Sequence, residues 1–182
     1  VKKLIDAVNA CNWDCAKFQK RNPDVCVPEH QKSVMRETPW GRMSYLDYKY
    51  RVELGSHEYY FIKKYSAEKP VDWTASVWDL DSLEFLMKYS VPFIKIPSAL
   101  ITDKELSIYA RECTIGYSGH EPDLEPTVIA VSLGAEVVER HITLSHDLWG
   151  TDQKSSLEVI GMDKLRKRCI DIKDMLGSGI KE

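Results

Sequence analysis

The sequence predicts an α/β protein built around a parallel sheet, and two observations support that fold class. Short apolar runs that end in polar residues alternate with longer segments of helical period, which is the pattern of repeated strand–helix units. The segments between these runs are long enough for the crossovers of a dozen or more residues that parallel strands require. At 182 residues the chain has the length of one ordinary domain, so we expect a single core.

The expected elements follow from this alternation. Five runs are the expected strands: residues 15–19, 72–77, 92–98, 114–118 and 136–143. Helices are expected at residues 1–9, 44–69, 80–89, 125–133 and 157–176. Ser44 can cap the second helix, Gly55 can divide it in two, and Gly177 is placed to end the last one. Residues 21–42 contain Pro23, Pro28 and Pro39, which predict a long loop.

Composition excludes several classes of function. Hydrophobic residues make up 43% and charged residues 29% of the chain, as in soluble globular proteins. The formal net charge of -3, with no basic block, argues against a nucleic-acid surface and favours a small-molecule partner. No apolar run approaches the roughly 20 residues that span a bilayer, and the start lacks the apolar region of a signal peptide. We therefore expect a cytoplasmic protein that does not enter membranes.

The cysteines indicate a reducing compartment. There are five, Cys11, Cys15, Cys26, Cys113 and Cys169, and they form neither C-x-x-C pairs nor a disulfide framework. Free, mostly buried thiols are expected.

Polar side chains gather where the expected strands end. The five strands finish with Lys17-x-Gln19, Ser76-x-x-Asp79, Lys95-x-x-Ser98, Ser118-x-His120 and Arg140-His141. Parallel α/β sheets bind ligands at the carboxyl ends of their strands. We therefore expect these side chains to line one pocket at that end of the sheet, called the mouth below. Lysines and serines suit a small anion such as phosphate or carboxylate, and two imidazoles can hold a divalent metal with open positions.

Plainer interpretations compete with this one. A lone histidine at a strand end is most often an ordinary surface or core residue, which is the interpretation for His30, His57 and His146. Lys95 is harder to dismiss, because a lysine within an apolar run is tolerated mainly when its ammonium reaches a partner at the rim. Asp152 could reach back to the mouth or could cap the last helix, a role that Ser155 or Ser156 could also fill.

The motifs, taken together and in order, resemble one family. They are Asp14-Cys15-Ala16-Lys17-Phe18-Gln19-Lys20, Val91-Pro92-Phe93-Ile94-Lys95-Ile96-Pro97-Ser98, Gly116-Tyr117-Ser118-Gly119-His120-Glu121, Leu133-Gly134-Ala135, Glu139-Arg140-His141-Ile142-Thr143-Leu144 and Trp149-Gly150-Thr151-Asp152. They resemble the N-acetylneuraminate (sialic acid) synthase family nearly from end to end. The resemblance implies a TIM-type (β/α) barrel that condenses phosphoenolpyruvate with N-acetylmannosamine, its 6-phosphate or a related hexosamine, and releases phosphate.

The resemblance also implies roles for residues. His120 and His141 match metal ligands, with Mn²⁺ the expected ion and Mg²⁺ or Co²⁺ as alternatives. The matches to phosphoenolpyruvate contacts are Lys17, Lys95, Ser98 and Ser118, and Ser76 ends a strand of the same mouth. Gln19 and Asp152 match residues near the sugar. We expect Lys95, Gln19 and Asp152 to take part in catalysis.

The chain departs from the family at several points. The family has two further strand–helix units where residues 110–114 stand here, and its first strand precedes Val1. We therefore expect one incomplete barrel domain over residues 1–182, with about five of eight strands. Since the retained motifs are intact, we expect the missing units to be absent from this sequence rather than lost from the protein. We also expect no C-terminal antifreeze-like domain within residues 1–182, although the family usually has one, and a full-length protein is expected to be a homodimer.

Family contacts at two further positions are changed. Ser98-Ala99-Leu100 replaces a Ser-Gly-Glu segment, which removes an acidic sugar contact, and Gln153 replaces a common histidine.

Two alternatives remain open at this point. Lys95 could form a Schiff base with a keto acid, as in a class I aldolase. A truncated barrel could also bind a sugar acid without turnover.

Overall fold

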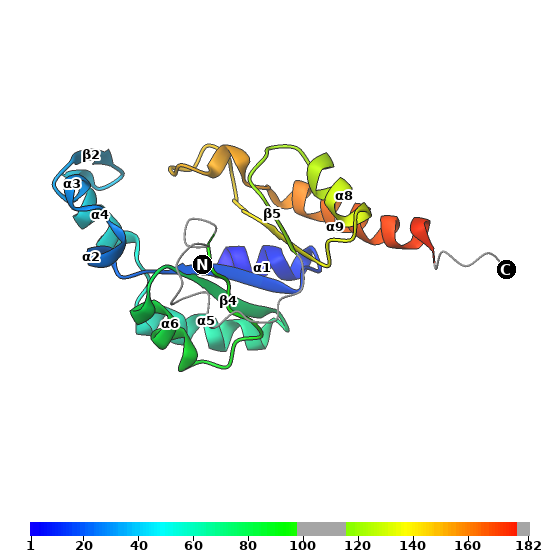
Figure 1. Cartoon of the computed structure of the whole chain (residues 1–182), viewed down its shortest axis with the longest axis horizontal. Helices are drawn as coiled ribbons and strands as arrows, with labels where there is room; N and C mark the ends of the chain where they lie inside the picture. Colours follow the sequence, from blue (N-terminus) through cyan, green and yellow to red (C-terminus); the bar gives the residue numbers. More distant parts are fainter. Residues whose placement is uncertain (98–115, 178–182) are drawn as a thin grey trace. The chain divides into compact units, whose positions relative to one another are not determined.

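The computed structural model describes residues 1–97 and 116–177, and the chain falls into two units (Figure 1). The first unit consists of Val1–Asp14 and Glu112–Glu182, and the second of Cys15–Arg111. The two are described separately below.

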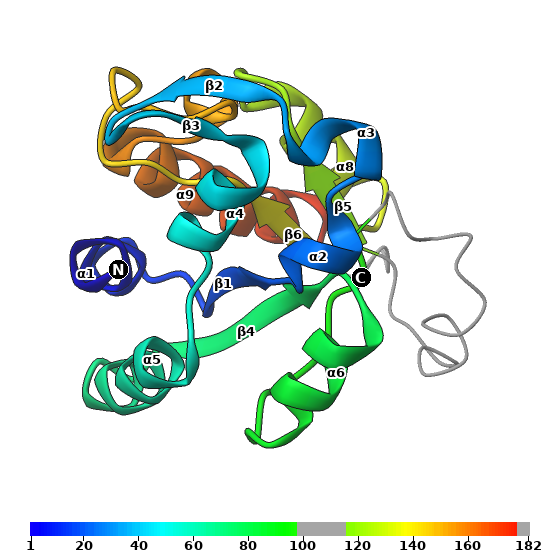
Figure 2. The ribbon, with the colours of Figure 1, turned by 90° about the vertical axis from the view of Figure 1, so that its left-hand side faces the viewer.

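The second unit is built on a pair of parallel strands. β1 (Cys15–Lys20) pairs with β4 (Asp72–Val77) in a register that sets Lys17 beside Thr74 and Gln19 beside Ser76. The helices α5 (Ser56–Glu68) and α6 (Leu80–Met87) lie along one face of this pair (Figures 1 and 2). The strands at 15–19 and 72–77 and the helix at 80–89 are thus confirmed, with small changes at their ends.

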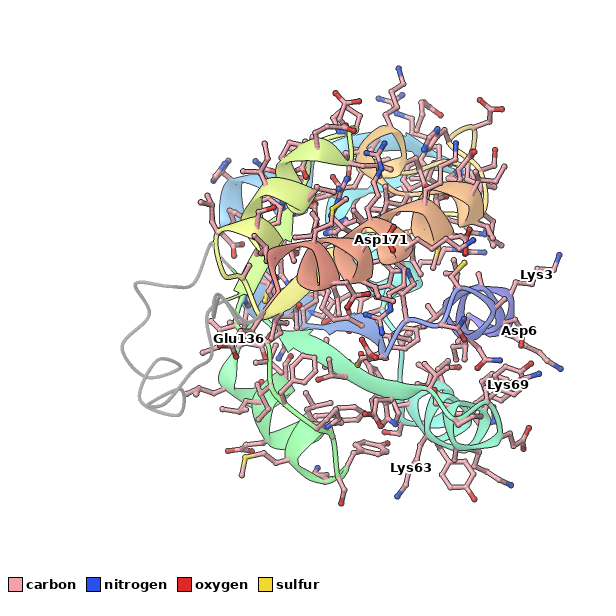
Figure 3. The ribbon with its side chains drawn as sticks, turned by 90° about the vertical axis from the view of Figure 1, so that its right-hand side faces the viewer. Lys3, Asp6, Lys63, Lys69, Glu136 and Asp171 are labelled. Carbon is pink, nitrogen blue, oxygen red and sulfur yellow. The ribbon has the colours of Figure 1, made fainter. Side chains whose placement is uncertain are left out.

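An aromatic core fills the space between these helices and β4. Tyr59 and Ile62 of α5 are fully buried against Trp73 of β4, and Leu83 and Leu86 of α6 complete the cluster. Burying a side chain of this size stabilises the fold by about 1.5–3 kcal/mol. On the outer side of α5, Lys63 points away from the strands (Figure 3).

The predicted break at Gly55 is confirmed. α4 (Tyr45–Val52) ends before this residue, and α5 begins directly after it. The Ser44 hydroxyl caps α4 by accepting a hydrogen bond from the Asp47 amide at 3.1 Å. The Gly55 amide donates to the Glu58 carboxylate at 2.9 Å, so both helix starts are satisfied locally.

The prediction of a long loop over residues 21–42 is wrong. The segment forms α2 (Pro23–Cys26), α3 (Glu29–Lys32) and an antiparallel hairpin of β2 (Met35–Thr38) and β3 (Gly41–Ser44), seen beside α4 in Figure 2. Proline fits the first turn of a helix and tight turns, because those positions need no donated amide. The three prolines therefore separate short elements instead of preventing them.

Residues 92–97 do not form the predicted strand, and Ser98 lies outside the described residues. Lys95 makes a single parallel bridge to Ser76, and its carbonyl accepts from the Val77 amide at 3.1 Å. Pro92 and Pro97 have no amide hydrogen, so a continuous ladder cannot extend through them. The segment still lies against β4, because the Thr74 hydroxyl donates to the Phe93 carbonyl at 2.5 Å.

The first unit contains the other parallel strand pair. β5 (Gly116–Gly119) pairs with β6 (Val137–Arg140), which places Gly119 beside Arg140. β6 is shorter than the predicted run over residues 136–143, and Ile142 forms only an isolated bridge to Leu157. Positions 114 and 115 lie outside the described residues.

Helices complete the first unit. They are α1 (Lys2–Ala10), α8 (Glu125–Ser132), a 3₁₀ turn (Gln153–Ser155) and α9 (Val159–Leu176), which Gly177 ends as predicted. The end of α1 is tied to α9, since the Trp13 indole donates to the Met162 carbonyl at 3.1 Å. Lys3 and Asp6 face outward from α1 (Figure 3).

Two expectations about the whole chain can be compared with the described residues. No helix there is long and apolar enough to cross a membrane. Cys11, Cys15, Cys26 and Cys169 are free thiols, as expected, and Cys113 lies outside the described residues.

Asp79 joins the two strand ends of the second unit. Its carboxylate caps α6 by accepting from the Ser82 amide at 2.7 Å, and it accepts from the Asn22 amide after β1 at 2.6 Å. Burial alone would raise the pKa of Asp79, but these hydrogen bonds outweigh burial and hold the pKa below its ordinary value. Burial and this carboxylate raise the pKa of Cys26 to about 12, so Cys26 stays a thiol.

Replacement of Asp79 by Asn is expected to destabilise the protein by about 1–2 kcal/mol at pH 7. A carboxyl whose pKa is lower in the folded state stabilises the fold above its unfolded pKa of about 3.9, and this contribution is lost as the pH falls through the folded pKa. The difference between wild type and D79N should therefore shrink from pH 7 to pH 3 in urea unfolding. Asp72→Asn, at an exposed position, serves as the control, and a pH-independent difference would contradict the role of the charge.

Candidate active site

The predicted site residues fall into two groups, one in each unit. Lys17, Gln19, Ser76 and Lys95 belong to the second unit, and Ser118, His120, His141 and Asp152 to the first. Gln19 and Ser76 lie near the carboxyl ends of their strands, and His120 and His141 directly follow theirs. Lys17 lies in the middle of β1, and Asp152 lies in the loop after β6. That the two groups form a single mouth stays a prediction.

The group in the second unit brings two lysines to one serine. Ser76, which is buried in β4, accepts a hydrogen bond from the Lys17 ammonium at 3.2 Å. The same residue forms the parallel bridge to Lys95. An ammonium group on a hydroxyl, with a second lysine on the neighbouring backbone, is an arrangement suited to an anion with several oxygen atoms.

Gln19 is held in place by a charged network at the end of β1. Its side-chain oxygen accepts from the Arg21 guanidinium at 2.9 Å, and the Arg21 Nε donates to Glu53 at 3.2 Å. Glu53 is only 9% exposed and also receives the Lys20 ammonium at 3.0 Å. Since Arg21 occupies the oxygen of the Gln19 amide, its nitrogen is the part left to meet a ligand oxygen. Sequence reasoning missed Glu53, which lies 34 residues from Gln19 and becomes a neighbour only when the chain folds.

The group in the first unit is centred on two imidazoles. His120 follows β5 and His141 follows β6, and their ring centroids lie 4.8 Å apart. Parallel pairing explains this proximity, because Gly119 and Arg140 are paired and the next residue of each strand continues in the same direction. Ser118 lies in β5 beside Glu139 of β6.

Asp152 approaches one of these imidazoles, that of His141, from the loop after β6. One of its carboxylate oxygens lies 3.7 Å from Nδ1 of His141. The capping alternative is wrong, because Glu158 occupies the N-cap position of α9. The Asp152 side chain caps nothing, whereas its backbone carbonyl accepts from the Ser156 hydroxyl at 2.7 Å. The side chain is thus available to the site.

An ion pair between a buried arginine and a partly exposed glutamate directly adjoins the two histidines in the chain. The Arg140 side chain is 1% exposed and its guanidinium lies 3.1 Å from the Glu121 carboxylate. Burial alone would raise the pKa of Glu121, but hydrogen bonds from its own amide and from Tyr117, together with the charge of Arg140, hold the pKa below its ordinary value. Sequence reasoning did not assign these residues a role, although a glutamate and an arginine directly flanking the two histidines were a visible signal.

The side chains of His120, His141 and Asp152 suit a divalent metal ion whose remaining coordination positions stay open to a substrate. Imidazole nitrogens and a nearby carboxylate are ligands that Mn²⁺, Fe²⁺ and Zn²⁺ accept. Within residues 1–97 and 116–177, no three histidine, cysteine or acidic side chains are grouped as a complete metal cage. The candidate metal site therefore consists of two imidazoles whose centroids lie 4.8 Å apart, with the Asp152 carboxylate 3.7 Å from one of them.

An open hollow of about 410 Å³ lies in the loop that carries Asp152. It is lined by His146, Leu148, Trp149, Gly150, Thr151, Gln153 and Lys154. Neither aspartate nor glutamate lines it, and Trp149 is half exposed. The hollow can therefore accept a polar ligand that meets the Lys154 side chain and the Trp149 ring.

One protein family matches this chain over nearly its whole length. The NeuB family model matches residues 4–111 and 107–181. This chain belongs to the NeuB family. The two matched segments meet at residues 107–111, near the position where the sequence predicts absent strand–helix units.

Several relatives are named as synthases of sugar acids. The chain is 27% identical to the human N-acetylneuraminate-9-phosphate synthase over 246 residues, covering all of this chain and 68% of the relative. It is 22% identical to the N,N'-diacetyllegionaminic acid synthase of Campylobacter jejuni over 246 residues, covering all of this chain and 74% of the relative. Because this chain has 182 residues, both relatives carry residues within the aligned region that have no counterpart here.

A solved structure shares the fold. The N-acetylneuraminic acid (sialic acid) synthetase of Leptospira borgpetersenii has a TM-score of 0.84 and 21% identity, over all of this chain and 80% of that one. The α/β fold class is therefore confirmed. An incomplete TIM-type barrel with about five of eight strands stays a prediction.

Proposed function

We propose that the protein is a sialic-acid-type synthase, a transferase that condenses phosphoenolpyruvate with N-acetylmannosamine, its 6-phosphate or a related N-acetylated hexosamine. The observation that carries this proposal is the pair of imidazoles beside Asp152 in a chain of the NeuB family. The names of the human and Campylobacter relatives support a nine-carbon sugar acid as the class of product.

In this proposal the second unit binds phosphoenolpyruvate. The ammonium groups of Lys17 and Lys95 neutralise its phosphate and carboxylate, and Ser76 keeps Lys17 directed toward them. The resemblance adds Ser98 and, from the first unit, Ser118 as further hydrogen-bond donors. Lysines suit this role because each is a flexible point charge that can follow a phosphate as it leaves.

The first unit binds the acceptor sugar. His120 and His141 would hold Mn²⁺, or Mg²⁺ or Co²⁺, which polarises the acceptor aldehyde when bound. Asp152 lies close enough to His141 to orient its ring and to accept a sugar hydroxyl. Gln19, which belongs to the second unit, matches a family residue near the sugar, and its amide nitrogen would donate to another sugar oxygen.

The proposed condensation forms one carbon–carbon bond and breaks one carbon–oxygen bond of phosphoenolpyruvate. C3 of phosphoenolpyruvate forms a bond to the aldehyde carbon of the acceptor, and the aldehyde oxygen takes up a proton. Water adds at C2, and the bond between C2 and the phosphate oxygen breaks, so phosphate leaves and a keto acid remains. Lys17 and Lys95 stabilise the charge on phosphate and carboxylate throughout, because fixed cations need no reorganisation during the reaction.

The hollow beside Asp152 favours a phosphorylated acceptor. Carbon 6 of the acceptor becomes carbon 9 of the product, so a 6-phosphate lies at the end of the sugar away from the reacting aldehyde. Lys154 lines the hollow two residues from Asp152, and no ion pair to it is found among the described residues. The half-exposed Trp149 ring can stack on the sugar between these points.

Metal binding is the first test. His120→Ala and His141→Ala are each expected to abolish retention of Mn²⁺, because each removes half of the imidazole pair. Elemental analysis after Mn²⁺ loading and desalting measures this directly. His146→Ala is the matched control in the same unit and should retain the metal. Full occupancy in either of the first two variants would contradict the pairing.

Acceptor choice is the second test. Lys154→Gln is expected to lower kcat/KM by about tenfold to a hundredfold for N-acetylmannosamine 6-phosphate, through loss of one charged hydrogen bond. The value for unphosphorylated N-acetylmannosamine should change less than about threefold. Lys164→Gln, at an exposed position of α9, is the control. An equal loss for both acceptors would contradict the phosphate contact.

Product formation is the decisive test. Incubation with phosphoenolpyruvate and either acceptor is expected to release one phosphate for each sugar acid formed, as measured by phosphate assay and mass spectrometry. Borohydride treatment with pyruvate should leave Lys95 unmodified. A covalent adduct on Lys95 would favour the Schiff-base aldolase, and sugar-acid binding without product would favour the non-catalytic alternative.

A further inference from the structure

The two histidines are flanked by one connected group of buried polar contacts. The Arg140 Nη1 donates to the Thr127 hydroxyl and to the Asp123 carbonyl, each at 3.0 Å, and Nη2 donates to the Glu121 carbonyl. Thr127 is fully buried, so these bonds form away from solvent. The guanidinium thereby connects the end of β6 to the chain that follows β5 and to α8.

The Glu121 carboxylate is held from three sides. Oε1 accepts from the Thr127 hydroxyl at 3.1 Å and lies 3.1 Å from Arg140, while Oε2 accepts from the Tyr117 hydroxyl at 3.0 Å. Both carboxylate oxygens and both terminal nitrogens of Arg140 are therefore engaged, whereas the buried Arg140 Nε has no hydrogen-bond partner among the described residues.

Gly119 leaves the space that this arrangement needs. A Cβ at this position would lie 2.6 and 2.7 Å from the two Glu121 carboxylate oxygens and 2.8 Å from the Tyr117 ring. Any side chain would push the carboxylate away from Arg140. Gly119 is also the residue paired with Arg140 across the strands.

Such a group contributes more to position than to stability. A buried ion pair is weak evidence for stability, because desolvation offsets its attraction, and its best-attested use is to fix a register. His120 lies between Gly119 and Glu121, and His141 follows Arg140 directly. A slip of either strand by one residue would break the ion pair and reverse the direction of one imidazole.

We propose that Arg140, Glu121, Tyr117 and Thr127 are positioning residues that hold the two imidazoles 4.8 Å apart, ready to share one ion. The inference rests on the proposed function for the identity of that ion. The orientation of the rings themselves does not depend on it.

The test combines metal affinity with a signal from the metal-free protein. In Glu121→Gln, the dissociation constant for Mn²⁺ is expected to rise about tenfold or more. It is measured from the electron paramagnetic resonance of free Mn²⁺, well below the unfolding temperature of the variant. In the metal-free variant, the imidazole NMR signals of His120 and His141 should shift, while those of His146 stay in place.

Two further variants make the test specific. Glu125→Gln removes an exposed partner of Arg168 in the same unit and should leave both measurements unchanged. Tyr117→Phe removes a single hydrogen bond and serves where Glu121→Gln fails to fold. It should weaken Mn²⁺ binding in the same direction as Glu121→Gln.

The outcomes separate the two ideas. A folded Glu121→Gln variant with wild-type Mn²⁺ affinity and unshifted His120 and His141 signals would overturn the positioning role. A wild-type protein that binds no Mn²⁺ would contradict the proposed metal site alone, and the NMR comparison would then decide the positioning role by itself.

Discussion

The parallel register of β5 and β6 is the constraint on which the proposed chemistry depends. Pairing Gly119 with Arg140 puts the next residue of each strand, His120 and His141, side by side at the same edge. In an antiparallel pair the two chains would leave this edge in opposite directions, and the imidazoles would separate. One backbone register thus creates the metal-binding potential of the first unit.

The second unit applies the same rule to anion binding. β1 and β4 run parallel, and Lys17 in the middle of β1 reaches Ser76, two residues beyond its own pairing partner Thr74. The single bridge from Ser76 adds Lys95 at the same level. Each unit therefore gathers one kind of chemistry, cationic in the second and imidazole-based in the first.

In both units an ion pair lies next to a side chain of the proposed site and fixes the orientation of its neighbours. Glu53 holds Arg21, which in turn holds Gln19, and Glu121 holds Arg140 beside His141. Such pairs are costly to desolvate, and additional hydrogen bonds to the paired groups offset part of that cost. Their position next to proposed site residues suggests that orientation, more than stability, is the reason for them.

Much of the local structure was determined by the sequence. The division of residues 44–69 at Gly55, the cap at Ser44 and the end at Gly177 follow from backbone preferences that act over a few residues. The motifs around Lys17, His120 and His141 likewise indicated which side chains carry chemistry, because polar residues at the ends of apolar strands are expensive unless used.

Tertiary structure decided the contacts between distant residues. The folding of residues 21–42 into short helices and a hairpin, and the reduction of residues 92–97 to one bridge, depended on which backbone amides found partners across the chain. Similarly, the pairing of Glu53 with Arg21 and the approach of Asp152 to His141 join residues far apart in sequence. Local preference carries no information on such partners, because their energy exists only after the strands have paired.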